Sequence, residues 1–258
     1  MLRSLLAFVG WLALFVAGKA LIAEGIGHNR LFVFVFALLL LAAYYAVAWW
    51  IERRRAAELR ANGAWLALLG AAVGLLLFCA SAGLVALLGY YHFAGASFSQ
   101  LAGGAIASFA AAVGEELLFR GFIFRFIEQA AGTWIAVLVS AVLFGLAHAL
   151  NRGATAREVL AIAVEAGVLL SAAYVYSRSL WLPIGIHFGW DFAGGAIFKK
   201  ATILPGPDVI TGGKAGIEGS LVAIVLCLAA GVALLVAAAR SGRCYRSSVG
   251  KPASTQPR

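Results

Sequence analysis

Acidic, basic and imidazole side chains lie inside three strongly apolar stretches of the chain. The first of these stretches contains Glu115, Glu116 and Arg120. If it is helical, Glu116 and Arg120 share one face a turn apart, with the acid N-terminal to the base, which favours an ion pair. Glu115 then points about 100° away from Glu116. Arg120 therefore neutralises one acid, and we expect the other to be left for chemistry.

The next two stretches each hold a histidine with a partner one helical turn away. Phe144 precedes His148 by four residues, so its ring should border the imidazole on the same helix face. Asp191 follows His187 by four residues, so these two ionisable groups also share a face. Taken alone, each group has a simpler explanation, such as a solvated helix end or a packed, hydrogen-bonded histidine.

Together these residues could hydrolyse a peptide bond without a covalent intermediate. A buried glutamate next to a histidine can hold and deprotonate a water molecule. A second histidine with a hydrogen-bonding neighbour can stabilise the oxyanion of the tetrahedral intermediate. We therefore predict that Glu115, His148, His187 and Asp191 converge in space, each carried by an apolar helix.

The composition indicates that these helices lie in a membrane. The chain has 258 residues, of which 63% are hydrophobic and 12% are charged. Soluble domains are about 45–50% apolar and about 25% charged, and a soluble fold of this size could not bury so much apolar surface. A charge at the centre of a bilayer costs between about 2.5 and 17 kcal/mol. The ionisable residues named above are therefore expected to have partners and a function.

Apolar runs of about 20 residues predict eight spans and thus an all-α, polytopic transmembrane helical bundle. The predicted spans are residues 5–23, 31–51, 64–90, 101–127, 133–150, 158–178, 181–198 and 217–240. Glycines in the seventh span, among them Gly185 and Gly189, should let a neighbouring helix approach closely. The expected parts are N-terminal helices (1–100), catalytic core helices (101–198), an external loop with the last helix (199–240) and a polar cytoplasmic tail (241–258).

Positive charges in the short loops predict the orientation of the bundle. Arg53, Arg54 and Arg55 follow the second span, and cytoplasmic loops of membrane proteins carry an excess of such residues. An even number of spans puts both termini on that side. We thus expect an integral membrane protein, of a bacterial plasma membrane, with cytoplasmic termini and an uncleaved first helix. The connection from Lys199 to Gly216 should be turn-rich and external.

The net charge of +9 does not indicate a nucleic-acid partner. No basic stretch is interleaved with exposed aromatic residues, and the arginines at the ends of apolar runs are suited to lipid headgroups. The three cysteines, Cys79, Cys227 and Cys244, show no zinc-binding spacing. The two histidines and two carboxylates could still bind zinc, but H-E-x-x-H is absent and we expect no metal or other cofactor.

In this order the motifs resemble those of the CPBP intramembrane proteases, which include the Ras-converting CAAX prenyl endopeptidases and bacteriocin-processing proteins. The resemblance covers about residues 102–198. Its three motifs read Glu115-Glu116-x-x-x-Arg120, Phe144-x-x-x-His148 and His187-x-x-x-Asp191. That family, once regarded as metalloproteases, is now better described as glutamic proteases.

The resemblance implies a role for each residue. Glu115 matches the general base, which acts with His148 on the attacking water, and Glu116 matches part of a supporting ion pair with Arg120. His187 and the last motif residue match the oxyanion-stabilising group. The prenyl endopeptidases carry Asn at that last position, so Asp191 either donates a hydrogen bond as a neutral acid or orients His187.

We accordingly expect an intramembrane endopeptidase that cleaves a hydrophobic or membrane-tethered, CAAX-like peptide and is otherwise in contact with membrane lipid. One alternative is a non-catalytic membrane immunity or scaffold protein that keeps the fold. Another is a transporter, because carboxylates inside membranes also relay protons.

Overall fold

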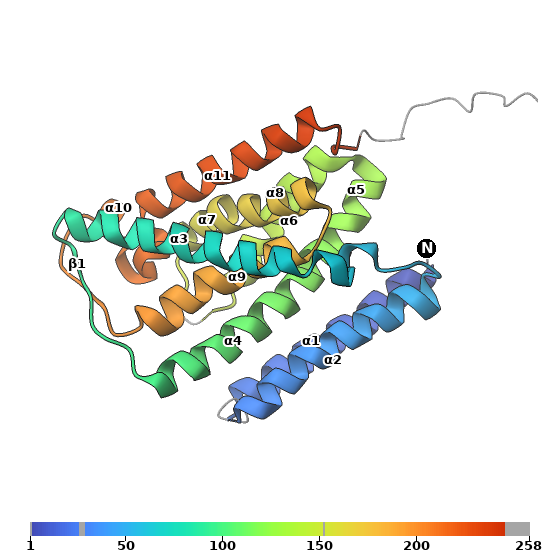
Figure 1. Cartoon of the computed structure of the whole chain (residues 1–258), viewed down its shortest axis with the longest axis horizontal. Coiled ribbons are helices and arrows are strands. Elements are labelled where there is room, and N and C mark those ends of the chain that lie inside the picture. The colour runs from blue at the N-terminus through green and yellow to red at the C-terminus, as the bar shows by residue number, and fades with distance from the viewer. Residues whose placement is uncertain (1, 26–28, 152, 246–258) are drawn as a thin grey trace, which may run out of the picture.

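The computed structural model describes residues 2–25, 29–151 and 153–245, and these residues are almost entirely helical (Figure 1). The predicted all-α, polytopic bundle is confirmed. Most of the predicted polar tail, from residue 246 onwards, lies outside the described residues. The helices are α1 (Leu2–Ala23), α2 (Arg30–Ala46), α3 (Trp65–Leu87), α4 (Phe98–Glu116), α5 (Arg125–Ala131), α6 (Thr133–His148), α7 (Ala156–Ile162), α8 (Val168–Ser177), α9 (Trp181–Phe192), α10 (Asp208–Thr211) and α11 (Leu221–Arg240).

Several of these helices are joined end to end by π-helical turns into longer rods. The π-helical segment η2 (Val47–Ile51) extends α2, η5 (Leu117–Phe124) joins α4 to α5, η6 (Ala163–Gly167) joins α7 to α8, and η7 (Ala193–Ile197) extends α9. Six of the resulting rods in the described chain are long and apolar enough to cross a membrane. Two of the eight predicted spans are shorter than expected, namely α6, with 16 residues, and the rod that begins with α9.

Large apolar side chains cover the outside of the bundle. Leu68 is 77% exposed, Leu76 is 66% exposed and Leu138 is 62% exposed. Soluble monomers rarely expose such extensive apolar surface, whereas lipid tails solvate it. The chain is an integral membrane protein.

One end of the bundle gathers the start of α1, the link between α2 and α3, and the end of α11 (Figure 1). An even number of membrane crossings produces this arrangement, because it brings both ends of the chain to the same side. The link carries the predicted basic cluster, but Arg54 is paired there with Glu52 at 2.6 Å and with Glu58 at 2.7 Å. These two acids therefore neutralise part of the positive charge on which the predicted membrane orientation is based.

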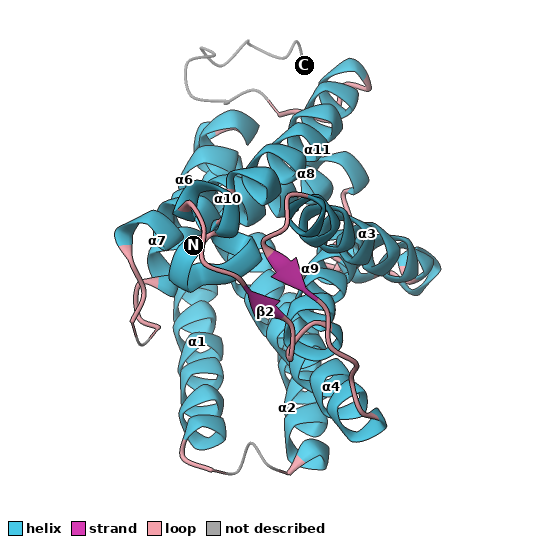
Figure 2. Cartoon of the chain, turned by 90° about the vertical axis from the view of Figure 1, so that its left-hand side faces the viewer, coloured by secondary structure: helices cyan, strands magenta, loops and turns pink. Residues whose placement is uncertain are grey.

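The connection after η7 is more ordered than the predicted turn-rich loop. Its strand β2 (Thr202–Ile203) pairs antiparallel with β1 (Tyr91–His92), which lies between α3 and α4 (Figure 2). It continues through α10 into the 3-10 segment η8 (Gly213–Gly219). This connection is therefore attached to the rest of the bundle by backbone hydrogen bonds.

Glycines bring α3 and α9 into direct backbone contact. A Cβ atom on Gly185 would lie 2.2 Å from the carbonyl oxygen of Ala67, and one on Gly189 would lie 2.1 Å from that of Ala71. On the facing helix, a Cβ on Gly74 would lie 2.0 Å from the carbonyl oxygen of Ile186. Small residues are the usual means of tight helix packing in membranes. They hold α9 between α3 and α4 (Figure 1).

We predict that Gly189→Ala lowers the free energy of unfolding by about 1–3 kcal/mol, because the added methyl group overpacks this contact. The matched control is Gly195→Ala, since no atom lies within 4 Å of a Cβ built on Gly195. Thermal unfolding of the purified proteins in detergent, followed by circular dichroism, makes the comparison. Equal stability of the two variants would contradict the close approach of α3 and α9.

Candidate active site

A fully buried ion pair lies at the junction of α4 and η5. Arg120 Nη1 donates to Glu116 Oε1 at 2.8 Å, and both side chains are completely buried. The pair predicted from the i, i+4 spacing is thus present. Within the described chain, Glu116 Oε2 and Arg120 Nε have no hydrogen-bond partner, so one hydrogen bond rather than two joins the side chains.

Arg120 also connects η5 to two other helices. Its Nη2 atom donates to the carbonyl oxygen of Gly167 at 3.1 Å, and its guanidinium lies 4.7 Å from the ring centroid of Phe144. Gly167 ends the π-helical segment η6, whose packing against α6 is so close that a Cβ there would lie 2.8 Å from Ala141 Cα. π-Helical turns often occur at functional sites. Here one of them presents a backbone acceptor to a buried cation.

His187 lies among three carboxylates. Its Nδ1 atom is 3.0 Å from Glu116 Oε1, and its Nε2 atom is 3.4 Å from Asp191 Oδ2 and 3.9 Å from Glu115 Oε2. Glu116 therefore serves both Arg120 and His187, which is more than the role of simple ion-pair partner that the sequence suggests. The contact with Glu116 fixes the ring orientation, so that Nε2 faces the remaining two acids.

Glu115 has a partner that the sequence does not reveal. Lys19 Nζ on α1 donates to Glu115 Oε1 at 3.1 Å, so Glu115 is not the unpaired acid that was expected. α1 can approach because Gly114 has no side chain, and a Cβ there would lie 2.5 Å from the ring of Phe15, one turn before Lys19. The other oxygen, Glu115 Oε2, accepts no hydrogen bond from the described residues and remains directed at His187.

His148 is held by its own helix rather than by Glu115. Its Nδ1 atom lies 2.8 Å from the carbonyl oxygen of Phe144, and the two rings are 4.9 Å apart between centroids. Because a carbonyl only accepts, Nδ1 carries a proton in this contact, and in the neutral ring Nε2 is the acceptor. No hydrogen bond or ion pair joins the described side chains of His148 and Glu115, so their joint action on a water molecule stays a prediction.

A cavity brings the two histidines together. Phe144, His148, His187 and Asp191 contribute to its wall, and its volume is about 60 Å³, which is enough for several water molecules. Glu115 is not part of the wall and meets this group through His187. Among the other residues of the wall are Glu165, Trp190, Glu218 and Cys227, which the sequence motifs did not indicate. A signal for Glu165 exists in the sequence, because it is the only charged residue between Glu158 and Arg178.

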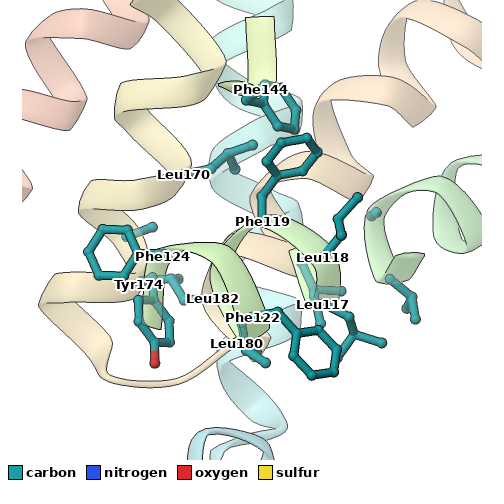
Figure 3. Close-up of a cluster of buried hydrophobic side chains, with 14 of the residues drawn as sticks. Leu117, Leu118, Phe119, Phe122, Phe124, Phe144, Leu170, Tyr174, Leu180 and Leu182 are labelled. Atoms are coloured by element: carbon teal, nitrogen blue, oxygen red, sulfur yellow. The ribbon is translucent and has the colours of Figure 1, made fainter. Parts of the chain in front are cut away.

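Aromatic and aliphatic side chains keep bulk solvent from the buried pair. Phe119 packs edge-on against Phe144 with centroids 5.0 Å apart, and Leu170 lies beside them (Figure 3). Below them, Phe124 contacts Tyr174 at 5.3 Å between centroids. This cluster fixes Phe144, which in turn borders both imidazoles.

The described residues contain no group of three or more His, Cys, Asp or Glu side chains arranged to hold a metal ion. The nearest approach to such a group is around His187. There Glu116 is already bound to Arg120 and Glu115 is bound to Lys19.

Comparison with known proteins finds a match in the part of the chain that contains these helices. Residues 96–193 match the family described as type II CAAX prenyl endopeptidase Rce1-like. This segment of the chain is similar to that family. It begins just before α4 and ends at the start of η7, so it contains all seven residues that the motifs predict. No curated protein and no solved structure matches the chain.

The description of the matched family names an endopeptidase activity. The matched segment leaves out three contributors to the geometry described above. Lys19 comes from α1, and Glu218 and Cys227 come from η8 and α11. The surroundings of the site therefore extend beyond the predicted core helices at both ends of the chain.

We predict that Arg120→Ala lowers the free energy of unfolding by about 3–5 kcal/mol, because it leaves Glu116 buried without a cation. The double variant Glu116→Leu with Arg120→Met should be far less destabilised, since it removes both charges. Arg240→Ala, at the exposed end of α11, is the control. Thermal unfolding in detergent measures all three. If Arg120→Ala is as stable as Arg240→Ala, the pair does not support the fold.

Proposed function

We propose that the chain is an intramembrane endopeptidase in which Glu115 and His148 activate a water molecule for attack on a peptide bond. The observation that carries the proposal is the position of His187, which is held by Glu116, faces Glu115 and Asp191, and shares a cavity with His148. An imidazole fixed in this way is suited to donate from Nε2 to a carbonyl oxygen that develops charge, which supports the proposal.

The first step is the addition of water to the scissile carbonyl. The 3.9 Å between Glu115 Oε2 and His187 Nε2 is too long for a direct hydrogen bond, and a shared water molecule would satisfy both groups. Glu115 takes a proton from that water as its oxygen bonds to the carbonyl carbon. His148, with Nε2 free to accept, orients the water from the cavity side.

The second step is the collapse of the tetrahedral intermediate. In the imidazolium form, His187 donates its Nε2–H to the oxyanion, and Glu116 prevents the ring from turning because it accepts from Nδ1. Asp191, at 3.4 Å from Nε2, is best suited to orient His187. The carbonyl re-forms as the C–N bond breaks, and the leaving amine takes the proton that Glu115 had accepted. No covalent intermediate is needed.

The surroundings of the site favour a hydrophobic or membrane-tethered peptide as the substrate. The cavity lies among membrane helices, and apolar side chains such as Ile162, Leu169 and Ile186 form much of its wall. A peptide held in the bilayer by an attached lipid or by its own apolar residues could reach it without crossing water. A CAAX-like C-terminal segment is one such peptide.

We predict that Glu115→Gln folds normally but loses proteolysis by at least about 100-fold, the usual contribution of a general base. His148→Ala should be similarly impaired. Comparative proteomics of cell membranes with wild type or Glu115→Gln should then reveal a peptide whose release requires Glu115. Glu24→Gln, which changes an exposed acid beyond α1, is the matched control. If both site variants keep full biological function, the protein is not a protease.

We predict that chelators leave this activity unchanged and that the purified protein contains no stoichiometric metal, because carboxylates and imidazoles alone carry the proposed steps. Elemental analysis and assays with and without EDTA or phenanthroline measure this directly. Stoichiometric zinc whose removal abolishes cleavage would replace the glutamate mechanism with a metal-dependent one.

A further inference from the structure

Two acids in the cavity wall have no role in the steps above. Glu165, on η6, is only 2% exposed, and its Oε2 atom has no hydrogen-bond partner among the described residues. Glu218, at the end of η8, accepts one hydrogen bond from Trp190 Nε1 at 3.3 Å. Both line the cavity that contains His148 and His187.

These acids differ from the paired acids of the bundle because no described residue supplies them with a cation. Glu58 pairs with Arg54 and Glu116 pairs with Arg120, but within the described chain no Lys, Arg or His nitrogen forms an ion pair with Glu165 or Glu218. A carboxylate in an apolar, low-dielectric wall is costly when unpaired. A buried acid with an unused acceptor oxygen, facing a cavity, is arranged to receive a donor from outside the chain.

The rest of the cavity fits the same kind of ligand. Its two carboxylates supply acceptors, and an ammonium group carries three N–H donors and a compensating charge. The side chains of Ile162, Leu169 and Ile186 can cover a methylene stem, as apolar surfaces do for lysine. The volume of about 60 Å³ admits an ammonium head with part of its stem.

We propose that Glu165, assisted by Glu218, forms a subsite for an ammonium group of the substrate, such as a lysine side chain close to the scissile bond. The proposal rests on the proposed function for the identity of the ligand, and the subsite itself rests on the geometry of the cavity. Glu165 then determines substrate specificity, because a neutral substrate side chain of the same length would leave Glu165 without a partner.

The first experiment does not depend on proteolysis. Thermal unfolding of the detergent-solubilised full chain is measured with n-pentylammonium or with n-pentanol at equal concentration, because a ligand of the folded state raises the Tm. In wild type and in the Glu24→Gln control, the ammonium compound should raise the Tm more than the alcohol does. In Glu165→Gln this difference should disappear. An equal effect of both compounds on wild type would overturn the proposal and would mean that Glu165 is kept neutral by a proton.

The second experiment uses prenylated CAAX-like peptides with lysine or norleucine at each of three positions on either side of the scissile bond. At one position, wild type should show a KM about tenfold lower for the lysine peptide. Glu165→Gln should raise that KM to the norleucine value, so that the preference for lysine disappears, and Glu218→Gln should have a smaller effect.

The outcomes separate the subsite from the protease activity. An unchanged lysine preference in Glu165→Gln, or an equal loss of kcat on both peptides, would overturn the subsite. If wild type cleaves none of the peptides, the proposed activity on CAAX-like substrates fails. The thermal measurement then decides on the ammonium subsite by itself.

Discussion

The site depends on the contacts that the buried guanidinium of Arg120 makes. Removing an ion pair from water is costly, and Arg120 offsets that cost with a carboxylate, a backbone carbonyl and an aromatic ring at once. Because those partners are Glu116, Gly167 and Phe144, one side chain ties three helices together. It also fixes the carboxylate that holds His187, so the geometry of the proposed oxyanion group follows from a contact made for stability.

Helix packing supplies the second constraint. Lipid tails are as apolar as leucine, so burial of apolar surface does little to hold membrane helices together, and close van der Waals contact does more. The glycines on α3 and α9 allow that contact, and it sets the depth and rotation of the helix that carries His187 and Asp191. Glycines, which have no reactive side chain, therefore determine the position of these two residues.

The charges inside the bundle fall into two groups with different consequences. Glu115 and Glu116 each have a cation from the chain, Lys19 and Arg120, and their geometry is complete in the isolated protein. Among the described residues, no cation forms an ion pair with Glu165 or Glu218. In a medium where an unpaired charge is costly, the first group serves to organise the site and the second is suited to recognition. The second group lines the cavity, and the first group reaches it through His187.

Composition and local spacing were enough to predict membrane insertion, the eight helical segments and the contacts one turn apart. The pairs Glu116–Arg120 and His187–Asp191 belong to this class, because any helix brings residues at i and i+4 together whatever surrounds it. The contact between Lys19 and Glu115 spans 96 residues, and that between Glu116 and His187 spans 71. Such contacts, like the approach of Glu165 and Glu218 to one cavity, depend on which helices are neighbours and how each is rotated. Spacing along the sequence does not specify either quantity, so only the tertiary structure decided them.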